Sequence, residues 1–226
     1  MDRDDPAYRG QADYTPFLLD LYDPIVIGVL SRLFWRCPPE PFLDNYRRNI
    51  TPRHLEVGPG TGYCIVHSGL PDGSSVTILD PNPNVLQHTS RKLTRFDVTA
   101  VEADALKPLP VDGPFESAGM NMVFHCLPAP LSLKGLAIQN IAAVLSPTGT
   151  LFGATILGRS ADHSWLGRRV LAAFNRRGAF DNLDDSEAGL RQILEASFEE
   201  VDIKIVGSAA IFEAQRPREA SPSQPG

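Results

Sequence analysis

A short apolar segment that runs directly into three closely spaced glycines constrains this chain more than any other feature. Residues 54–57 (His-Leu-Glu-Val) have the composition of a buried strand, and Gly58, Gly60 and Gly62 follow at once. Glycine adopts backbone conformations that other residues avoid, and it leaves the main chain bare, so a ligand can lie directly against such a turn. The segment therefore predicts a strand, a ligand-binding turn and then a helix.

Most of the remaining sequence alternates apolar runs with amphipathic segments. Continuous apolar runs are typical of strands buried on both faces of a parallel sheet. We expect strands at 54–57, 75–79, 99–102, 118–124, 150–155, 201–206 and 209–214. We expect helices at 24–35, 41–49, 62–68, 84–95, 133–145, 164–176 and 186–196. Asn84 is the expected N-cap of its helix, and Pro147 with Gly149 is expected to end the helix before the fifth strand.

Only Gly207 and Ser208 separate the last two expected strands, which suits a hairpin. The predicted fold is α/β, Rossmann-like and doubly wound, with a mostly parallel seven-stranded sheet and an antiparallel terminal strand. We divide the chain into an N-terminal tail with lid helices (1–49), a ligand-binding domain (50–216) and a disordered tail (217–226). Within the domain, residues 161–185 form an insert that is expected to cover the substrate.

The composition restricts the compartment in which we expect the protein and the classes of partner it could bind. The formal net charge of -6 argues against a nucleic-acid partner, which needs a basic surface. The three cysteines, Cys37, Cys64 and Cys126, are isolated, which favours a reduced cytoplasmic chain over a disulfide scaffold or a metal site. The N-terminus has no signal-peptide pattern, and the apolar run 24–35 is too short to cross a bilayer. We therefore expect a cytoplasmic protein with no metal and no stable membrane insertion; the oligomeric state is not predicted.

Polar residues follow several of the expected strands, and the carboxyl ends of parallel strands meet at one edge of a sheet. Asp80 ends the second strand, Asp104 follows the third, and Asn121 and His125 lie near the end of the fourth. The Asp80 carboxylate can accept hydrogen bonds from two ribose hydroxyls, and Asp104 can accept one from an exocyclic amine such as that of adenine. Glu56 would either face a cationic ligand or organise the glycine turn.

Two other nucleotide ligands fit the glycines less well. The dinucleotide fingerprint is G-x-G-x-x-G, whereas here the third glycine, Gly62, comes one position early and Tyr63 takes its place. A nucleoside triphosphate site would need a G-K-[ST] sequence after the glycines, and none follows.

With its acidic residue included, the sequence Glu56-x-Gly58-x-Gly60-x-Gly62 resembles the first motif of class I S-adenosylmethionine-dependent methyltransferases. Four later segments are similar to further motifs of that family, namely 79–83, 102–106, 121–128 and 145–151. Thr148 stands where the family has a glycine. The resemblance covers roughly residues 50–157.

The resemblance implies a cofactor, S-adenosylmethionine, and a role for each matching position. Gly58 and Gly60, with Thr61 and Gly62 in the same turn, would pass against its methionine portion. Asp80 would bind the ribose, with Asn82 in the same pocket. Asp104 would meet the adenine amine beside Ala105, and Asn121 would meet the amino-acid end. Tyr22, in a Tyr-Asp pair similar to one in small-molecule members, would reach over the cofactor.

The resemblance also implies a reaction. The sulfonium is already electrophilic, so the protein mainly has to align an acceptor, and His125 is the candidate general base where that acceptor carries a proton. We expect O- or N-methylation of a small or medium organic acceptor, with secondary metabolism as one setting. Aromatic residues that would line its pocket are Tyr14, Tyr22, Trp165, Phe174 and Phe180. The alternative is a protein that binds the cofactor but acts as a partner subunit, or catalyses a cyclisation or rearrangement.

Overall fold

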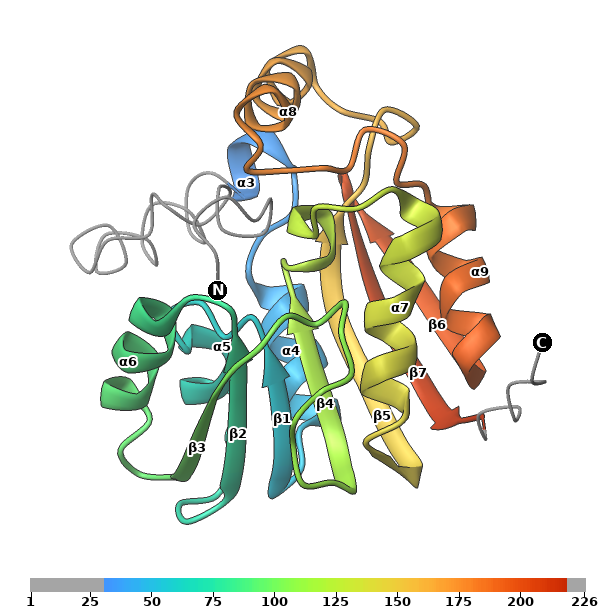
Figure 1. The fold of residues 1–226 in the computed structure, drawn as a ribbon. Coiled ribbons are helices and arrows are strands. Elements are labelled where there is room, and N and C mark those ends of the chain that lie inside the picture. The colour runs from blue at the N-terminus through green and yellow to red at the C-terminus, as the bar shows by residue number, and fades with distance from the viewer. Residues whose placement is uncertain (1–30, 219–226) are drawn as a thin grey trace.

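A seven-stranded sheet forms the centre of the computed structural model, which describes residues 31–218 (Figure 1). Tyr14 and Tyr22 lie outside the described residues. The strands are β1 (Arg53–Val57), β2 (Ser75–Asp80), β3 (Asp97–Glu102), β4 (Phe115–Asn121), β5 (Leu145–Ile156), β6 (Phe198–Val206) and β7 (Ala209–Pro217). Their order across the sheet is β3-β2-β1-β4-β5-β7-β6. β1 to β5 pair in parallel, and β7 runs antiparallel to both β5 and β6. The predicted fold class is confirmed.

Helices cover both faces of this sheet and its carboxyl edge (Figure 1). They are α3 (Ser31–Phe34), α4 (Glu40–Asn49), α5 (Tyr63–Val66), α6 (Pro83–Lys92), the 3-10 helix η2 (Phe124–Cys126), α7 (Leu131–Ala142), α8 (Trp165–Arg177) and α9 (Glu187–Ser197). One core joins Ile138 of α7 and Leu194 of α9 to the sheet, and a second core joins Tyr46 of α4 and Leu86 of α6 to the opposite face. α3 and α8 lie beyond the carboxyl ends of the strands, where the sequence predicted a ligand site. No helix among residues 31–218 is long and apolar enough to cross a membrane.

Two predicted helix boundaries were wrong for identifiable reasons. Asn84 does not cap α6, because its backbone N–H donates to Oδ1 of Asn82 at 3.0 Å and Pro83 occupies the first turn, so Asn82 is the cap. α7 ends at Ala142, before Pro147 and Gly149, which lie within β5. There the register of β5 with β4 shifts, since Phe115 pairs with Leu145 but Ser117 pairs with Thr150.

The fourth strand ends three residues earlier than predicted. Met122 follows it with a φ of 59°, which turns the chain, and Phe124–Cys126 form the 3-10 helix η2. Asn121 is therefore the last residue of β4, and His125 lies in the turn beyond it. At the other end of the chain, β7 continues through Pro217, one residue into the predicted tail.

A buried ion pair fastens the segment 178–186, which follows α8, to the rest of the domain. Lys134 of α7 is completely buried, and its Nζ donates to Oδ2 of Asp185 at 2.7 Å and to the carbonyl of Asp181 at 2.6 Å. Asp181 N–H in turn donates to the carbonyl of His125, and the Asn182 side chain donates to the carbonyl of Ile156. The chain after α8 is thus tied to η2, which follows β4, and to the end of β5.

Burial disfavours the charged forms of this pair. Burial raises the pKa of Asp185 even though Lys134 is in contact, so desolvation of the carboxylate outweighs its attraction to the Lys134 ammonium. A buried pair of this kind adds little net stability when intact, but either charge left alone is strongly unfavourable.

We therefore predict that Lys134→Ala lowers the free energy of unfolding by about 3–5 kcal/mol, because it leaves Asp185 buried without its partner. Urea denaturation measures the change. Removing both partners, in Lys134→Ala/Asp185→Ala, should cost less than the Lys134 variant alone. The control is Arg47→Ala, which breaks an exposed pair with Asp44 and should cost less than about 1 kcal/mol. Equal losses in the Lys134 and Arg47 variants would contradict the prediction.

Candidate active site

A cavity of ≈ 390 Å³ lies at the carboxyl ends of the parallel strands, beneath α3 and α8. Every predicted cofactor-binding residue that the structure describes lines this cavity, and so does His125: Glu56, Gly58, Gly60, Thr61, Gly62, Asp80, Asn82, Asp104, Ala105, Asn121 and His125. Residues from β1, β2 and the turn after β3 line one half, which we call the cofactor half. Asn121, at the end of β4, also borders the cofactor half. Residues from α3, α8, the turn after β4 and the end of β5 line the other half, which we call the acceptor half.

The glycine turn opens into this cavity at Gly60. Gly58, Gly60 and Gly62 have φ values of 66°, 55° and 75°, which favour glycine. A Cβ on Gly58 would lie 2.3 Å from a methyl of Val123, so this position is also closed by packing. A Cβ on Gly60 would meet no atom within 4 Å, and Thr89 Oγ1 donates to its carbonyl at 2.7 Å. The turn is therefore held from behind and bare on its cavity side.

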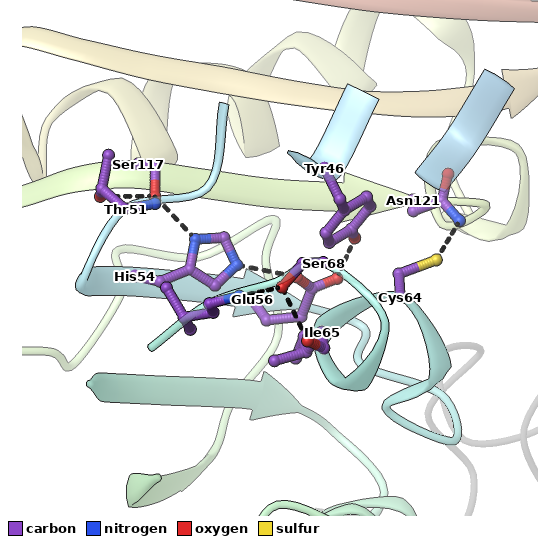
Figure 2. A network of polar contacts seen from close by, with 10 residues as sticks. Tyr46, Thr51, His54, Glu56, Cys64, Ile65, Ser68, Ser117 and Asn121 are labelled. Carbon is purple, nitrogen blue, oxygen red and sulfur yellow. Dashed lines mark hydrogen bonds and ion pairs between the residues drawn. The ribbon is translucent and has the colours of Figure 1, made fainter. Parts of the chain in front are cut away.

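Beneath the turn, Glu56 is buried and both of its carboxylate oxygens are occupied (Figure 2). Tyr46 O–H donates to Oε1 at 2.6 Å, and Nε2 of His54 lies 2.9 Å from Oε2. Burial, and then the charge of Glu56, raises the pKa of the Tyr46 hydroxyl well above its usual value. Because its oxygens are committed, Glu56 is placed to organise the turn rather than to bind a ligand.

The network continues from His54 to a neighbouring strand. Its Nδ1 lies 2.9 Å from the hydroxyl of Ser117 on β4, which accepts from the backbone N–H of Thr51 at 3.0 Å (Figure 2). Gly119 leaves room for the carboxylate, since a Cβ there would lie 2.4 Å from Glu56 Oε2. These contacts join α4, β1 and β4 directly under the ligand-binding turn. The sequence analysis missed this network, whose partners lie far apart in the chain.

Asp80 ends β2 at the cofactor half of the cavity. Its Oδ1 accepts from the N–H of Asn82 at 2.8 Å. Burial raises the pKa of this carboxyl to about 7, and the hydrogen bond from Asn82 only partly opposes the rise. A ligand that donates hydrogen bonds to the carboxylate would favour its ionised form.

Asp104 and Ala105 lie at the same end of the cavity. Asp104 accepts from Leu106 N–H through Oδ1 at 2.9 Å. Its other oxygen is 3.8 Å from the mostly exposed ammonium of Lys107, a weak contact that leaves it accessible to a donor. Ala105 is buried beside it, and its carbonyl accepts from Asn140 at 3.0 Å.

Asn121 carries an unsatisfied acceptor at the end of β4. Its Nδ2 donates to Sγ of Cys64 at 3.6 Å (Figure 2), whereas its Oδ1 is buried without a hydrogen-bond partner among the described residues. Such an atom costs about 1–3 kcal/mol when it stays unpaired. A cationic or amide donor in the cavity would satisfy it, as the ammonium of an amino-acid ligand does.

His125 lies where the end of β4 meets β5. The ring is buried, and its Nδ1 accepts from Ile156 N–H at 3.2 Å, with Thr155 Oγ1 at the same distance. Phe180 packs edge-on against it at 4.3 Å between ring centroids. Burial, reinforced by the charge of Lys134, lowers the pKa of His125 to about 3. The imidazole is therefore neutral at physiological pH but only weakly basic, which does not favour the predicted role as a general base.

Aromatic side chains wall the acceptor half. Trp35 packs near Phe180 with 6.0 Å between ring centroids, and Phe174 meets Phe180 at 5.0 Å. Phe174 and Phe180 line the cavity as predicted, but Trp165 lies on the surface with 66% exposure. It is the first residue of α8 and does not line the cavity. Trp35 and Phe42 also line the cavity; they lie in the expected helices 24–35 and 41–49, where the sequence pattern predicts helix but not a pocket.

Among residues 31–218, no group of three histidine, cysteine or acidic side chains is arranged to hold a metal ion.

Comparison with known proteins identifies the family. A family model described as a methyltransferase domain matches residues 26–197. The chain is 36% identical over 213 residues to a demethylluteothin O-methyltransferase of Streptomyces thioluteus, covering 93% of both chains. It is 31% identical to a physcion biosynthesis cluster O-methyltransferase of Aspergillus chevalieri, covering 94% of this chain and 97% of that one. It is also 35% identical to the N-methyltransferase vrtF of Penicillium aethiopicum, covering 81% of this chain and 78% of that one.

A solved structure shares the fold. The N-methyltransferase NodS of Bradyrhizobium japonicum, in complex with S-adenosyl-L-homocysteine, matches with a TM-score of 0.53 at 16% identity, covering 73% of this chain and 78% of that one. The sheet order, the glycine turn with its carboxylates and the family match lead to the same conclusion. The chain belongs to the class I S-adenosylmethionine-dependent methyltransferases that act on small molecules.

Proposed function

We propose that the cofactor half of the cavity holds S-adenosylmethionine and that the acceptor half holds a small or medium organic molecule of secondary metabolism, which is methylated on oxygen or nitrogen. The observation that carries this proposal is the single cavity that joins the glycine turn and its carboxylates to an aromatic chamber. The relatives support it, since two are named O-methyltransferases and one an N-methyltransferase.

The residues of the cofactor half fit this ligand chemically. When bound, S-adenosylmethionine supplies an electrophilic methyl group on a sulfonium. Asp80 would accept from the ribose hydroxyls, with Asn82 beside it, and Asp104 would accept from the adenine amine. Asn121 Oδ1 would accept from the ammonium of the amino-acid end, which pairs the orphaned oxygen. Gly60 would allow the methionine portion to lie against the backbone, and a contact from Tyr22 stays a prediction.

The acceptor half would act through alignment and exclusion of water. Its walls are apolar and aromatic, and the segment 178–186 is fixed against α7 by Lys134 and against β5 by Asn182. Holding an acceptor in a reactive orientation can supply much of the rate enhancement of a transfer reaction. The insert 161–185 would therefore shape the pocket as well as cover it.

Incubation with methyl-labelled S-adenosylmethionine and a panel of hydroxylated and amino aromatic acceptors tests the proposal. Labelled product is expected from at least one acceptor. Tight binding of S-adenosylhomocysteine, without transfer to any oxygen or nitrogen acceptor, would contradict methylation while leaving cofactor binding intact.

The raised pKa of Asp80 leads us to predict that cofactor binding depends on pH. Because its pKa is about 7 before binding and hydrogen-bond donors favour the ionised form, the affinity for S-adenosylhomocysteine should rise with pH up to about 7 and level off above it. Below that point one proton is released per ligand bound. Calorimetry in buffers of different ionisation enthalpy measures the proton count directly.

The matched control is Asp80→Asn. It should lower affinity by about 10- to 100-fold at pH 8, the range expected for losing hydrogen bonds to a charged group. It should also remove the proton release that Asp80 causes, while any titration of the ligand itself persists. Identical pH profiles in the two proteins would show that Asp80 does not meet the ligand.

Gly60 and Gly73 form a second matched pair, because both have positive φ and open space at the Cβ position, but only Gly60 lines the cavity. Leucine at either site should cost about 1–2 kcal/mol of stability through the left-handed backbone. Gly60→Leu should abolish binding of S-adenosylhomocysteine, and Gly73→Leu should leave it unchanged. Binding by Gly60→Leu with normal affinity would place the cofactor elsewhere.

A further inference from the structure

The hydrogen bond to His125 determines which ring nitrogen carries the proton. The N–H of Ile156 points to Nδ1 at 3.2 Å, and a backbone amide can only donate. Nδ1 therefore holds a lone pair, and the proton of the neutral ring resides on Nε2. Thr155 Oγ1, also near Nδ1, can adapt because a hydroxyl either donates or accepts. Within residues 31–218, Nε2 itself makes no hydrogen bond, and the ring lines the cavity.

A base at this position would conflict with that bond. A base could accept the proton on either ring nitrogen. If Nε2 accepted it, the neutral ring would have to start with its proton on Nδ1, where it would clash with the N–H of Ile156. If Nδ1 accepted it, the lone pair that now accepts from Ile156 would be used up. Both routes break the hydrogen bond to β5.

The surroundings of His125 oppose a cation and favour an anion. Lys134 of α7 is the charged group that acts on the ring, and it lowers the pKa of His125 in addition to burial. Asp185 of the segment 178–186 pairs with Lys134, and Asp181 of that segment donates its backbone N–H to the His125 carbonyl. Cys126, next in η2, is a half-buried thiol, and Phe180 packs against the His125 ring.

Two other ionisable side chains close to the acceptor half, Cys126 and Tyr46, do not take up a proton near neutral pH either. Burial raises the pKa of the Cys126 thiol to about 12, so the sulfur stays protonated. The Tyr46 hydroxyl is a donor to Glu56, whose two oxygens are both engaged. Among the described residues, the acceptor half thus offers a hydrogen-bond donor at His125 and no base.

We propose that the acceptor is an acidic hydroxyl compound that enters as its oxyanion, and that His125 donates a hydrogen bond from Nε2 to this oxygen. The proposal rests on the methyltransferase function proposed above and specifies its substrate class. A phenol with electron-withdrawing groups, or an enol conjugated to a carbonyl, ionises in water before it binds. The aromatic walls of Trp35, Phe174 and Phe180 suit the planar shape of both.

The transfer then balances without moving a proton. A lone pair of the oxyanion forms the new O–CH3 bond, the S–CH3 bond breaks, and its electron pair stays on sulfur. One anion and one sulfonium become a neutral ether and a neutral thioether. His125 keeps its proton throughout and positions the oxygen.

Nitrogen-15 NMR of the histidine side chains tests the tautomer independently of activity. The chain has five histidines, and the His125→Gln variant assigns the His125 signals by their loss. We expect shifts of a neutral ring protonated on Nε2 that do not change between about pH 5 and pH 8, where an ordinary histidine titrates. Titration of His125 in that interval, or a proton on Nδ1, would overturn the proposal.

Two variants separate a donor from a base. Glutamine places an N–H donor near the position of Nε2 but cannot act as a base, and phenylalanine fills the space with neither function. For a donor, His125→Gln should keep kcat/KM within about tenfold of the native enzyme, and His125→Phe should lose about 10- to 100-fold. Equal losses of about 10²- to 10⁴-fold in both would indicate a general base and contradict the proposal. Thermal unfolding and S-adenosylhomocysteine binding verify that each variant is folded.

The ionisation of the bound acceptor gives a second readout without turnover. 4-Nitrophenol absorbs differently as phenol and phenolate, so its spectrum in the presence of protein and S-adenosylhomocysteine reports its state. The apparent pKa of the probe should fall on binding and fall less with His125→Phe. A rise in its pKa on binding would contradict oxyanion binding.

The pH dependence of turnover completes the test. With two phenols of different acidity, the rise of kcat/KM with pH should follow the pKa of each phenol rather than one shared value. A shared value would assign the titration to the enzyme and overturn the inference, while the methyltransferase function would stand. Failure of the protein to bind S-adenosylhomocysteine at all would instead overturn the proposed function itself.

Discussion

The buried carboxylate of Glu56 is the contact on which the geometry of the site depends. It lies at the end of β1, directly before the glycine turn, and it receives Tyr46 from α4 and His54 from its own strand (Figure 2). Through Ser117 the same network reaches β4. A buried charge is tolerated only where its hydrogen bonds are satisfied, so the three elements have to keep this arrangement together. The turn above it is then fixed while its Gly60 side remains bare.

The positions of the residues in the cofactor half could be predicted from short local motifs combined with a general rule of sheet topology. Asp80 and Asp104 each follow a recognisable apolar strand, and parallel strands present their carboxyl ends at one edge. No long-range contact is needed to place them. The predicted element boundaries were wrong where local backbone geometry determines them. The positive φ of Met122 ends β4 at Asn121, and Asn82 rather than Asn84 caps α6.

The acceptor half could not be derived in this way, because its residues are placed by partners distant in sequence. Lys134 meets Asp185 across 51 positions, and that contact brings Phe180 against His125. His125 stood out as a titratable residue, but its sequence gives no sign that the N–H of Ile156 occupies Nδ1. A histidine with an open Nδ1 would have been a reasonable base. Because Nδ1 of His125 accepts the N–H of Ile156, the ring offers the N–H of Nε2 as a donor instead.

The two halves of the cavity therefore differ in whether their side chains change protonation state near neutral pH. In the cofactor half, Asp80 is poised between its neutral and ionised forms and responds to a ligand that donates hydrogen bonds. In the acceptor half, burial holds His125 and Cys126 in their neutral states, so neither of these two side chains titrates near pH 7. The pH dependence of cofactor binding is then set by the pKa of Asp80, and the pH dependence of methyl transfer is set by the pKa of the acceptor. An active site divided in this way selects its substrate by acidity as well as by shape, because only an acceptor that sheds its proton in water arrives ready to react.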